Sequence, residues 1–438
     1  MKVPFSPPDM TEQEAQEVRE AILSGWITTG PRTKKLEQEI SAYVHTDKTV
    51  CLNSATAAME MVLHLLGIGP GDEVIVPAYT YTATASVVTH VGATLVMVDS
   101  QKDNVEMDYD QLADAITERT KVIVPVDLGG VVADFDRVFE IVEAKKGLFK
   151  PNNALQAKIG RIVVSADCAH SFGASRYVND NLNNGKKVNK MAGEIADFSS
   201  FSFHAVKNFT TAEGGAMTWN LPFGNEAVPT DVDYMPTVPK KEGETWNELL
   251  YRLSQLFSLH GQNKDALAKT KLGAWEYDII GPWYKCNMTD IMAALGLVQM
   301  ERYPQMLKRR YQMVDRYNKA IDDLNANLDA EHQVRYLNHK SEDHCGSHHL
   351  YIVRLTGRTR EEANHVIEKM AERDIACNVH YKPLPMMTAY KALGFDIANY
   401  PNAFHLFENE ITLPLHTCMT DEMQEFVIKN FVEIVKGL

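Results

Sequence analysis

The feature that most constrains the fold is a regular alternation of short apolar segments and helical segments between residues 73 and 166. The apolar segments cover residues 73–77, 94–98, 121–126 and 162–166, and the helical segments between them cover residues 82–90, 109–116 and 135–143. Short apolar strands separated by helices are typical of a mostly parallel sheet with helices on both faces. The sequence therefore predicts an α/β fold around such a sheet.

Further elements flank this alternation. Strand-like segments lie at residues 50–52, 198–203 and 216–219. Near the N-terminus, Thr11 and Glu14 form a capping-box pattern, which opens a helix that ends near Leu23. A second helix is expected over residues 33–43, and a third follows the strand at 50–52.

Three polar stretches interrupt the pattern. Residues 145–161 contain Pro-Asn-Asn and predict a surface insertion. Residues 177–190 are rich in Asn and Lys and predict a loop with solvated lysines. Residues 221–244 contain several prolines and mixed charges, which indicates a long excursion across the surface.

The order of elements changes in the last part of the chain. A helix is expected over residues 246–259, and one long helix or two in succession over 288–317, with Thr289 as the N-cap. A strand at 350–355 and helices at 359–372 and 421–435 predict a small α+β domain. We therefore expect a large domain with an N-terminal arm over residues 1–275, and a smaller domain over 276–438.

Composition excludes several function classes. With 438 residues, 45% of them hydrophobic, the chain has ample material for a sizeable core. The net charge of −14, without a long basic tract, argues against a nucleic-acid partner. No window approaches the roughly 20 apolar residues of a membrane span, and the N-terminus lacks the apolar core of a signal peptide. The six cysteines form no CxxC pair, so we expect a cytoplasmic protein without structural zinc.

Chemistry is suggested first by Lys207, which lies just past the strand at 198–203. Burial at such a position lowers the pKa of a lysine and makes it a usable amine nucleophile. This is what a lysine needs to form a Schiff base with a carbonyl. The alternative is a surface lysine in a loop.

Asp167 directly follows the strand at 162–166, and ligands of parallel sheets bind where strands end. An aspartate and a lysine on neighbouring strand ends suit pyridoxal phosphate (PLP). The lysine holds the aldehyde, and the carboxylate keeps the ring nitrogen protonated. The alternative for Asp167 is a strand-end cap or a salt bridge.

Other patterns are weaker alone. The turn at residues 53–58 precedes a helix and offers backbone N–H groups to a phosphate, although an ordinary N-cap by Asn53 or Ser54 is the commoner explanation of such a turn. Tyr79 or Tyr81 could stack on a cofactor ring or pack in the core. His348 and His349 are adjacent and on a strand would face opposite sides, so the sequence supports no metal site.

Taken together, several segments resemble the successive signature blocks of the DegT/DnrJ/EryC1/StrS family. Its members are PLP-dependent aminotransferases of fold type I that act on nucleotide-linked keto sugars. The matching segments are residues 53–57, 77–84, 167–170, 202–207, 213–215 and 284–291, with Gly30-Pro31 and Val379-His380-Tyr381 also fitting. The likeness runs in order from about residue 10 to about residue 430.

The resemblance implies a role for each matching position. Lys207 matches the Schiff-base lysine and Asp167 the partner of the pyridinium nitrogen. Tyr81 matches the aromatic residue that stacks on the ring, which favours it over Tyr79. His170 matches a Gln/His position near the phenolic oxygen of the ring.

The phosphate is expected to be held by backbone groups of Thr56 and Ala57 and by the hydroxyl of Ser202. Asn287 matches an asparagine that reaches the phosphate from the neighbouring subunit, so the resemblance implies a homodimer. Two positions depart from the family. Asp127 stands where a histidine is frequent, and Cys286 stands where tyrosine is usual. The departures and the insertions at 145–161 and 221–244 border the expected substrate cleft.

The implied reaction is a ping-pong transfer of an amino group from an amino acid, by resemblance L-glutamate, to the keto group of a nucleotide-linked sugar. Lys207 argues against the dehydratases of the family, which carry histidine at that position. An aminotransferase acting on a cyclitol or another non-nucleotide ketone stays open. From a different class, a non-catalytic PLP-binding regulator is the remaining alternative.

Overall fold

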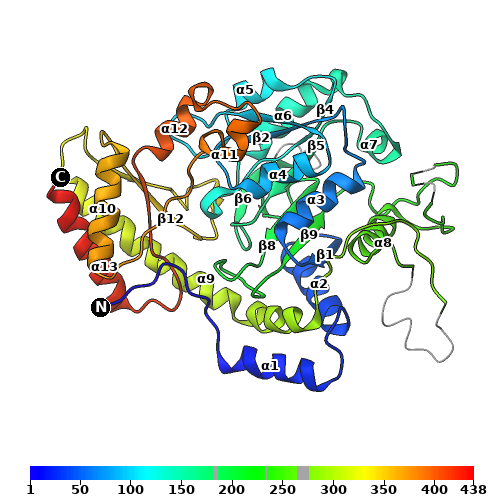
Figure 1. The fold of residues 1–438 in the computed structure, drawn as a ribbon, viewed down its shortest axis with the longest axis horizontal. Helices are drawn as coiled ribbons and strands as arrows, with labels where there is room; N and C mark the ends of the chain where they lie inside the picture. Colours follow the sequence, from blue (N-terminus) through cyan, green and yellow to red (C-terminus); the bar gives the residue numbers. More distant parts are fainter. Residues whose placement is uncertain (181–185, 233, 236, 264–275) are drawn as a thin grey trace.

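The computed structural model describes residues 1–180, 186–232, 234–235, 237–263 and 276–438. Its largest sheet has seven strands in the order β1-β9-β8-β5-β4-β2-β3 (Figure 1). The strands are β1 (Lys48–Leu52), β2 (Glu73–Pro77), β3 (Thr94–Val98), β4 (Thr120–Ile123), β5 (Val163–Asp167), β8 (Phe198–Ser202) and β9 (Gly215–Trp219). The pairs from β3 through β8 are parallel, and β9 is antiparallel to both of its neighbours. The α/β prediction with a mostly parallel sheet is confirmed.

Helices bury both faces of this sheet. On one face, Val74 and Val76 of β2 pack in a core with α3 (Ala55–Leu65), α4 (Thr82–His90) and α8 (Trp246–Ser258). On the other face, Ile75 packs in a core with α2 (Pro31–Tyr43), α5 (Tyr109–Ala115), α6 (Phe135–Ala144) and α9 (Asp290–Asn325). Successive residues of a strand point to opposite faces, so a strand buried on both sides must be apolar at every position. This is why the short apolar segments located the strands.

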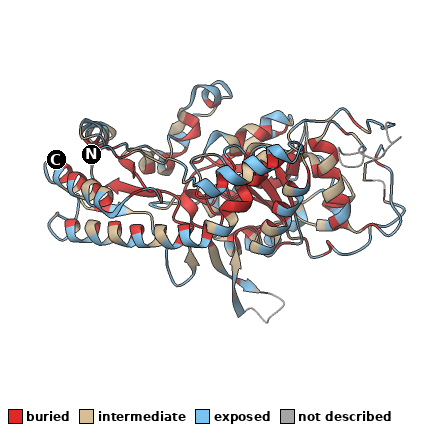
Figure 2. Cartoon of the chain, turned by 90° about the horizontal axis from the view of Figure 1, so that it is seen from below, coloured by how far each residue is buried: buried red, intermediate tan, exposed pale blue. Residues whose placement is uncertain are grey.

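The stretch at 177–190 is not a loop as expected. Residues 175–180 (β6) and 186–191 (β7) form an antiparallel ribbon, and β11 (His344–Cys345) pairs with the other edge of β6. Figure 2 shows these strands projecting from the body of the protein. Lys187 is paired with Asp343 at 2.7 Å rather than merely solvated. The strands are mostly polar, so they lack the apolar signal that marks strands of the central sheet.

The insertion at 145–161, expected as a polar surface segment, contains a helix that the sequence analysis did not predict. It contains α7 (Ala154–Ile159), whose N-cap Asn153 donates through its side chain to the Leu66 carbonyl at 2.7 Å. Leu155 of α7 is fully buried. The insertion is therefore tied to the end of α3. Of the stretch at 221–244, residues 233 and 236 lie outside the described part.

The C-terminal part is built on α9, which is one helix with Pro304 inside it and Thr289 as its N-cap. Its second sheet has the order β10-β12-β13. The elements are β10 (Val334–Tyr336), β12 (Tyr351–Leu355), β13 (Glu410–Leu413), α10 (Arg360–Glu372), α11 (Thr388–Ala392), α12 (Pro401–Phe407) and α13 (Asp421–Lys436). A separate core, which includes Val353 and Phe431, lies between this sheet and α9, α10 and α13. The domain boundary at residues 275 and 276 stays a prediction, because 264–275 lie outside the described residues.

The first half of α9 packs against α1 (Glu12–Leu23) and α2 and so joins the C-terminal part to the large sheet (Figure 1). The capping box of Thr11 and Glu14 on α1 is present. In the described part of the chain, no helix is both long and apolar enough to serve as a membrane span.

Asp290, the first residue of α9, supplies the cap that α2 lacks. The N-cap of α2 is Gly30, which has no side chain to cap it. The buried Asp290 carboxylate instead accepts the N–H groups of Arg32 at 3.1 Å and Thr33 at 2.9 Å. The Thr33 hydroxyl donates to the same carboxylate at 2.8 Å.

Asp290→Ala is expected to lower the free energy of unfolding by about 2 kcal/mol, because it leaves buried donors without an acceptor. Urea unfolding followed by circular dichroism measures the change. The control is Asp323→Ala, which removes an exposed partner of Lys319 on the same helix and is expected to cost less than about 0.5 kcal/mol. Equal effects of the two substitutions would contradict the capping role.

Candidate functional site

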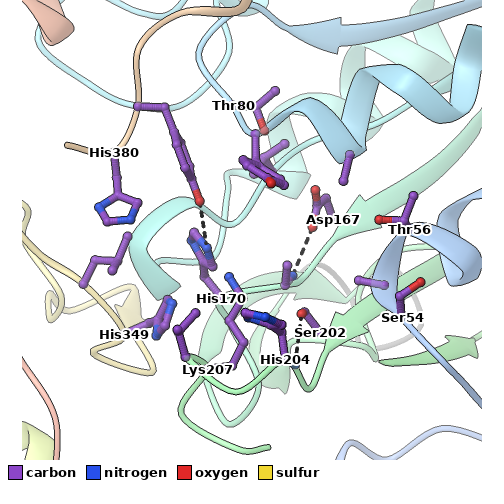
Figure 3. Close-up of a pocket in the computed structure, with 18 of the residues that line it drawn as sticks. Ser54, Thr56, Thr80, Asp167, His170, Ser202, His204, Lys207, His349 and His380 are labelled. Atoms are coloured by element: carbon purple, nitrogen blue, oxygen red, sulfur yellow. Dashed lines mark hydrogen bonds between the residues drawn. The ribbon is translucent and has the colours of Figure 1, made fainter. Parts of the chain in front are cut away.

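A cavity of about 360 Å³ opens at the carboxyl ends of β5 and β8, next to the start of α3. Six of the residues singled out from the sequence line it: Thr56, Tyr81, Asp167, His170, Ser202 and Lys207. Figure 3 shows the side chains of Asp167 and Lys207 entering the same space from different elements. β5 and β8 are parallel neighbours, so both end at the same edge of the sheet. The two residues are thus brought together as the strand-end argument predicted.

Lys207 lies in the turn that follows β8, where its N–H donates to the His204 carbonyl at 2.9 Å. Burial lowers the pKa of its amine to about 8, and the negative charge of Asp167 works in the opposite direction. The amine is therefore far closer to its neutral, nucleophilic form at neutral pH than an ordinary lysine.

Asp167 is the last residue of β5 and is almost fully buried. Its carboxylate accepts the Thr84 hydroxyl at 2.7 Å and the Ala169 N–H at 3.1 Å. Burial raises the pKa of the carboxyl, while these two hydrogen bonds and the charge of Lys207 oppose the rise. Such a carboxylate is stabilised further by any cationic N–H group that enters the cavity.

His170 is a neutral imidazole with a defined tautomer. Burial, followed by the charges of Lys207 and His380, holds its pKa well below the usual range. The Gly129 N–H donates to Nδ1 at 3.1 Å, so the ring hydrogen resides on Nε2. Nε2 lies 3.2 Å from the Tyr381 hydroxyl. Because His170 lines the cavity, this N–H group can donate a hydrogen bond there.

The start of α3 forms an anion-binding cup beside Ser202. Ser54 is the N-cap, and its hydroxyl accepts the Ala57 N–H at 3.1 Å. The N–H groups at the first positions of a helix have no intrahelical acceptor, and they favour an anion. Ala57 itself does not line the cavity, and its N–H is already bonded; its predicted phosphate contact stays a prediction.

Gly215 allows β9 to approach this cup closely. A Cβ at this position would lie 2.4 Å from the Ala55 nitrogen and 2.7 Å from the Phe201 carbonyl oxygen. Ser202 and Gly215 are paired across β8 and β9, so a side chain here would push the Ser202 hydroxyl away from the helix start. The absence of a side chain at Gly215 is therefore what allows the cup to form.

The two candidate tyrosines have different surroundings. Tyr81 is 59% exposed, lines the cavity, and has its ring centre 5.8 Å from that of Tyr381. Tyr79 is 1% exposed and donates its hydroxyl to the His380 carbonyl at 2.8 Å. Only Tyr81 of the two has a ring face open to a ligand.

Asn287 lies outside the cavity of its own chain. Its side chain donates to the Thr29 hydroxyl at 2.5 Å and accepts from Lys285. The segment around it runs beside the end of β1, where the Asn53 N–H donates to the Cys286 carbonyl at 2.8 Å. A role for Asn287 in the site of a second subunit stays a prediction.

Four cavity residues from the C-terminal part were not predicted as site residues: His349, Leu350, His380 and Tyr381. His349 donates from Nδ1 to the Asn208 side-chain oxygen at 2.8 Å. The buried Arg310 of α9 donates to the carbonyls of His348 and His349 and so fixes their segment. His380 and Tyr381 belong to the segment 379–381 that fits the family, but that fit assigned them no role. Their places depend on contacts with residues distant in sequence, such as His170 for Tyr381 and Asn208 for His349.

The N-terminal arm also reaches the cavity. The Ser6 hydroxyl donates to the Val206 carbonyl at 3.1 Å, next to Lys207. Phe5 stacks on His380 with ring centres 5.6 Å apart. The arm therefore covers the junction between the lysine turn and the C-terminal part.

Asp127 does not face the cavity. It is fully buried, and its carboxylate accepts the Ser171 hydroxyl at 2.6 Å and the Ala133 N–H at 2.9 Å. It therefore braces the backbone beside His170. The described residues of the insertions at 145–161 and 221–244 are not among those that line this cavity. That the insertions border the substrate cleft stays a prediction.

The donor set fits PLP. A lysine of lowered pKa, a buried carboxylate and an anion-binding helix start surround one cavity, and these match the aldehyde, ring nitrogen and phosphate of the cofactor. Within the described residues, no group of three or more His, Cys, Asp or Glu side chains is arranged to hold a metal ion.

A sequence profile of the DegT/DnrJ/EryC1/StrS aminotransferase family matches residues 8–432. The chain belongs to this family. The match spans nearly the whole chain, so both the large sheet and the C-terminal part are family elements.

Individual relatives of the family agree. The chain is 32% identical over 441 residues to the spore coat polysaccharide biosynthesis protein SpsC of Bacillus subtilis, covering 99% of this chain and 97% of SpsC. It is also 32% identical over 443 residues to the UDP-4-amino-4-deoxy-L-arabinose–oxoglutarate aminotransferase of Shewanella sediminis, covering 99% and 98% of the two chains.

Solved structures of Spr1654 from Streptococcus pneumoniae, a candidate sugar aminotransferase, share the whole fold. The form with pyridoxamine phosphate (PMP) is 52% identical to this chain with a TM-score of 0.87 and full coverage of both chains. The PLP form is 50% identical with a TM-score of 0.86, covering 100% of this chain and 99% of the other. The fold-type I assignment is therefore confirmed.

The lowered pKa of Lys207 predicts an early rise in its reactivity as the pH increases. In cofactor-free protein, acylation of Lys207 should reach half its maximal rate near pH 8, where an ordinary lysine is about 0.4% neutral. Asp167→Asn removes the charge that favours the protonated amine, so the midpoint should fall further. Peptide mass spectrometry after brief acylation measures both.

Lys319 is the internal control, because its pKa is raised by the hydrogen bond to Asp323. Its acylation should lag well behind that of Lys207 at pH 8. Two results would contradict this account of the Lys207 pKa. One is an acylation rate with the same pH midpoint for Lys207 and Lys319, and the other is a midpoint for Lys207 that rises in Asp167→Asn.

Proposed function

We propose that the protein is an aminotransferase that moves an amino group from L-glutamate to the keto group of a nucleotide-linked sugar. The cofactor is pyridoxal phosphate. The observation that carries the proposal is the convergence of Lys207, Asp167 and the cup at Thr56 and Ser202 on one cavity. The names of the relatives support the sugar acceptor: one acts in polysaccharide biosynthesis and another is an aminotransferase of a UDP-linked amino sugar.

Each residue has a distinct task in this reaction. PLP, when bound, supplies an aldehyde and an electron-withdrawing ring. Lys207 would hold the aldehyde, and its amine, once free, would take the Cα proton of the donor as a general base and return it to the cofactor as a general acid. Asp167 holds a proton on the ring nitrogen by its negative charge.

The remaining residues orient the cofactor. Backbone N–H groups at the start of α3 and the Ser202 hydroxyl bind the phosphate. Tyr81 would cover one face of the ring, and His170 would donate from Nε2 to its phenolic oxygen. The two half-reactions then share one cavity in a ping-pong order, in which the keto acid leaves before the sugar enters.

The proposal includes a homodimer in which Asn287 of each chain serves the site of its partner. In support, Asn287 lies outside its own cavity, yet its segment borders the end of β1 that leads into the phosphate cup. A cytoplasmic location is also part of the proposal, because all six thiols are free, as expected in a reducing compartment.

Two substitutions test the chemistry. Lys207→Ala should abolish turnover and also prevent the attachment of PLP that borohydride traps at residue 207 in the wild type. Asp167→Asn should still bind PLP but lower the rate of proton removal from L-glutamate by about 10²–10⁴. Deuterium loss from Cα-labelled glutamate measures that step.

Near wild-type deuterium loss in Asp167→Asn would remove the ring-protonation role. A wild type that takes up PLP but never converts it to PMP with glutamate would point to a regulator instead. Offering a panel of nucleotide-linked ketones and cyclitol ketones to the PMP form identifies the acceptor class.

Subunit complementation tests the placement of Asn287. Lys207→Ala and Asn287→Ala proteins are each expected to be strongly impaired. A mixed dimer contains one site with both Lys207 and the partner's Asn287, so mixing after mild dissociation should restore activity. If Asn287 served its own chain, no mixed dimer would contain an intact site, and mixing would restore nothing.

A further inference from the structure

A buried carboxylate behind the cavity has no role in the reaction described above. Glu410 is the first residue of β13 and is fully buried, and it does not line the cavity. Thr412 is two residues further along the same strand, so the two side chains share one face. That face points toward His380, which does line the cavity.

Hydrogen bonds connect the three residues in a row. The Thr412 hydroxyl donates to Glu410 Oε1 at 2.5 Å, and His380 Nδ1 lies 2.9 Å from the Thr412 oxygen. The other carboxylate oxygen, Oε2, accepts the backbone N–H of His380 at 3.0 Å. The carboxylate therefore binds the histidine both directly and through the threonine.

These bonds fix the tautomer of His380. A hydroxyl has one hydrogen, and that of Thr412 goes to Glu410, so its oxygen must accept a hydrogen from His380 Nδ1. Nε2 of the neutral ring is then a lone-pair acceptor. Within the described residues Nε2 has no hydrogen-bond partner, and a ligand in the cavity can use it.

The surroundings decide which group takes up a proton. Burial raises the pKa of Glu410 to about 7, and the Thr412 and His380 hydrogen bonds and then Arg360 oppose the rise. Burial, followed by the charge of Lys207, lowers the pKa of His380 to about 3. The carboxyl group, and not the imidazole, is thus the proton acceptor of this row near neutral pH.

Other charged or titratable groups face Glu410 from each neighbouring element. Arg354 is its cross-strand partner on β12, and Arg360 of α10 donates to its carbonyl. Tyr79, Tyr381 and Cys377 are close enough for Glu410 to raise their pKa values, and all three stay protonated near neutral pH. Glu410 is therefore the group of this set that titrates near pH 7.

We propose that Glu410 and Thr412 are positioning residues that make His380 a proton carrier between the cavity and a buried carboxylate. When a ligand gives a proton to Nε2, the Nδ1 hydrogen passes to the Thr412 oxygen, and the threonine hydrogen passes to Glu410 Oε1. The result is a neutral Glu410, an unchanged hydroxyl and a neutral His380 with its hydrogen on Nε2. The reverse transfer returns one proton to the ligand.

This inference rests on the proposed function, because transamination needs such a carrier at two points. The ammonium group of the amino-acid donor must lose one proton before its nitrogen can attack a carbonyl carbon. In the second half-reaction the ketone oxygen of the acceptor leaves as water and must gain protons. The row takes up one proton in the first case and returns it in the second, while Lys207 remains free for the Cα proton.

Glu410→Gln provides a direct test. The amide oxygen must still accept the His380 N–H, so its NH₂ group faces Thr412 and donates to it. The threonine hydrogen then turns to His380 Nδ1, and the ring must carry its hydrogen on Nε2. Nitrogen NMR of cofactor-free protein with labelled histidine reads the tautomer, with the His380 signals assigned by their loss in His380→Gln.

The wild type is expected to change from the Nδ1–H to the Nε2–H tautomer as the pH falls through about 7. Glu410→Gln should show Nε2–H throughout, Thr412→Ser should behave as the wild type, and Thr412→Val should lose the pH dependence. Circular dichroism confirms that the variants fold. A constant wild-type tautomer from pH 6 to 9, or Nδ1–H in Glu410→Gln, would overturn the proposal.

Kinetics give an independent measure on the PLP-loaded enzyme. Glu410→Gln and Thr412→Val should lower kcat by about 10² with little change in KM, and Thr412→Ser should restore it. Unchanged kcat in Thr412→Val would overturn the carrier role. If the protein never accepts PLP, the proposed function fails, whereas the NMR result still decides whether the hydrogen-bond row exists.

Discussion

The opposite charges of Asp167 and Lys207 are the constraint that determines the arrangement of the rest of the site. Burial raises the pKa of the Asp167 carboxyl, and the loss of solvation at the half-buried Lys207 lowers the pKa of its amine. Their mutual attraction and the bonds from Thr84 and Ala169 offset part of that cost. The parallel pairing of β5 and β8 is what makes such a meeting possible, because it opens both strand ends at one edge.

The charge of Lys207 also reaches the histidines of the cavity. It lowers the pKa values of His170, His349 and His380, in addition to the larger effect of burial. Loss of the proton of Lys207 would therefore raise the proton affinity of all three imidazoles. The protonation of residues from both parts of the chain is thus coupled to one amine.

The central sheet and the Lys207–Asp167 pair could be predicted because their signals are local. Strands such as β2 are buried on both faces, so every position is apolar, and catalytic groups follow strand ends.

The β6–β7 ribbon could not be predicted, because its strands are polar and depend on pairing with each other and with β11. His349 and His380 were missed for a related reason: Arg310, Asn208 and Thr412, which hold them, act through the folded structure alone. Asp127 shows the converse, since a position next to the site supports the backbone rather than the ligand.

The N-terminal arm has a practical consequence. Val3 pairs with Ile375 in the C-terminal part, Phe5 stacks on His380 and Ser6 is bonded to the carbonyl beside Lys207. A purification tag fused to Met1 would be attached directly to a segment that contacts both sides of the catalytic pocket. Removal of the first few residues by an aminopeptidase would eliminate these contacts. An affinity tag is therefore better placed after Leu438, which follows α13, than before Met1.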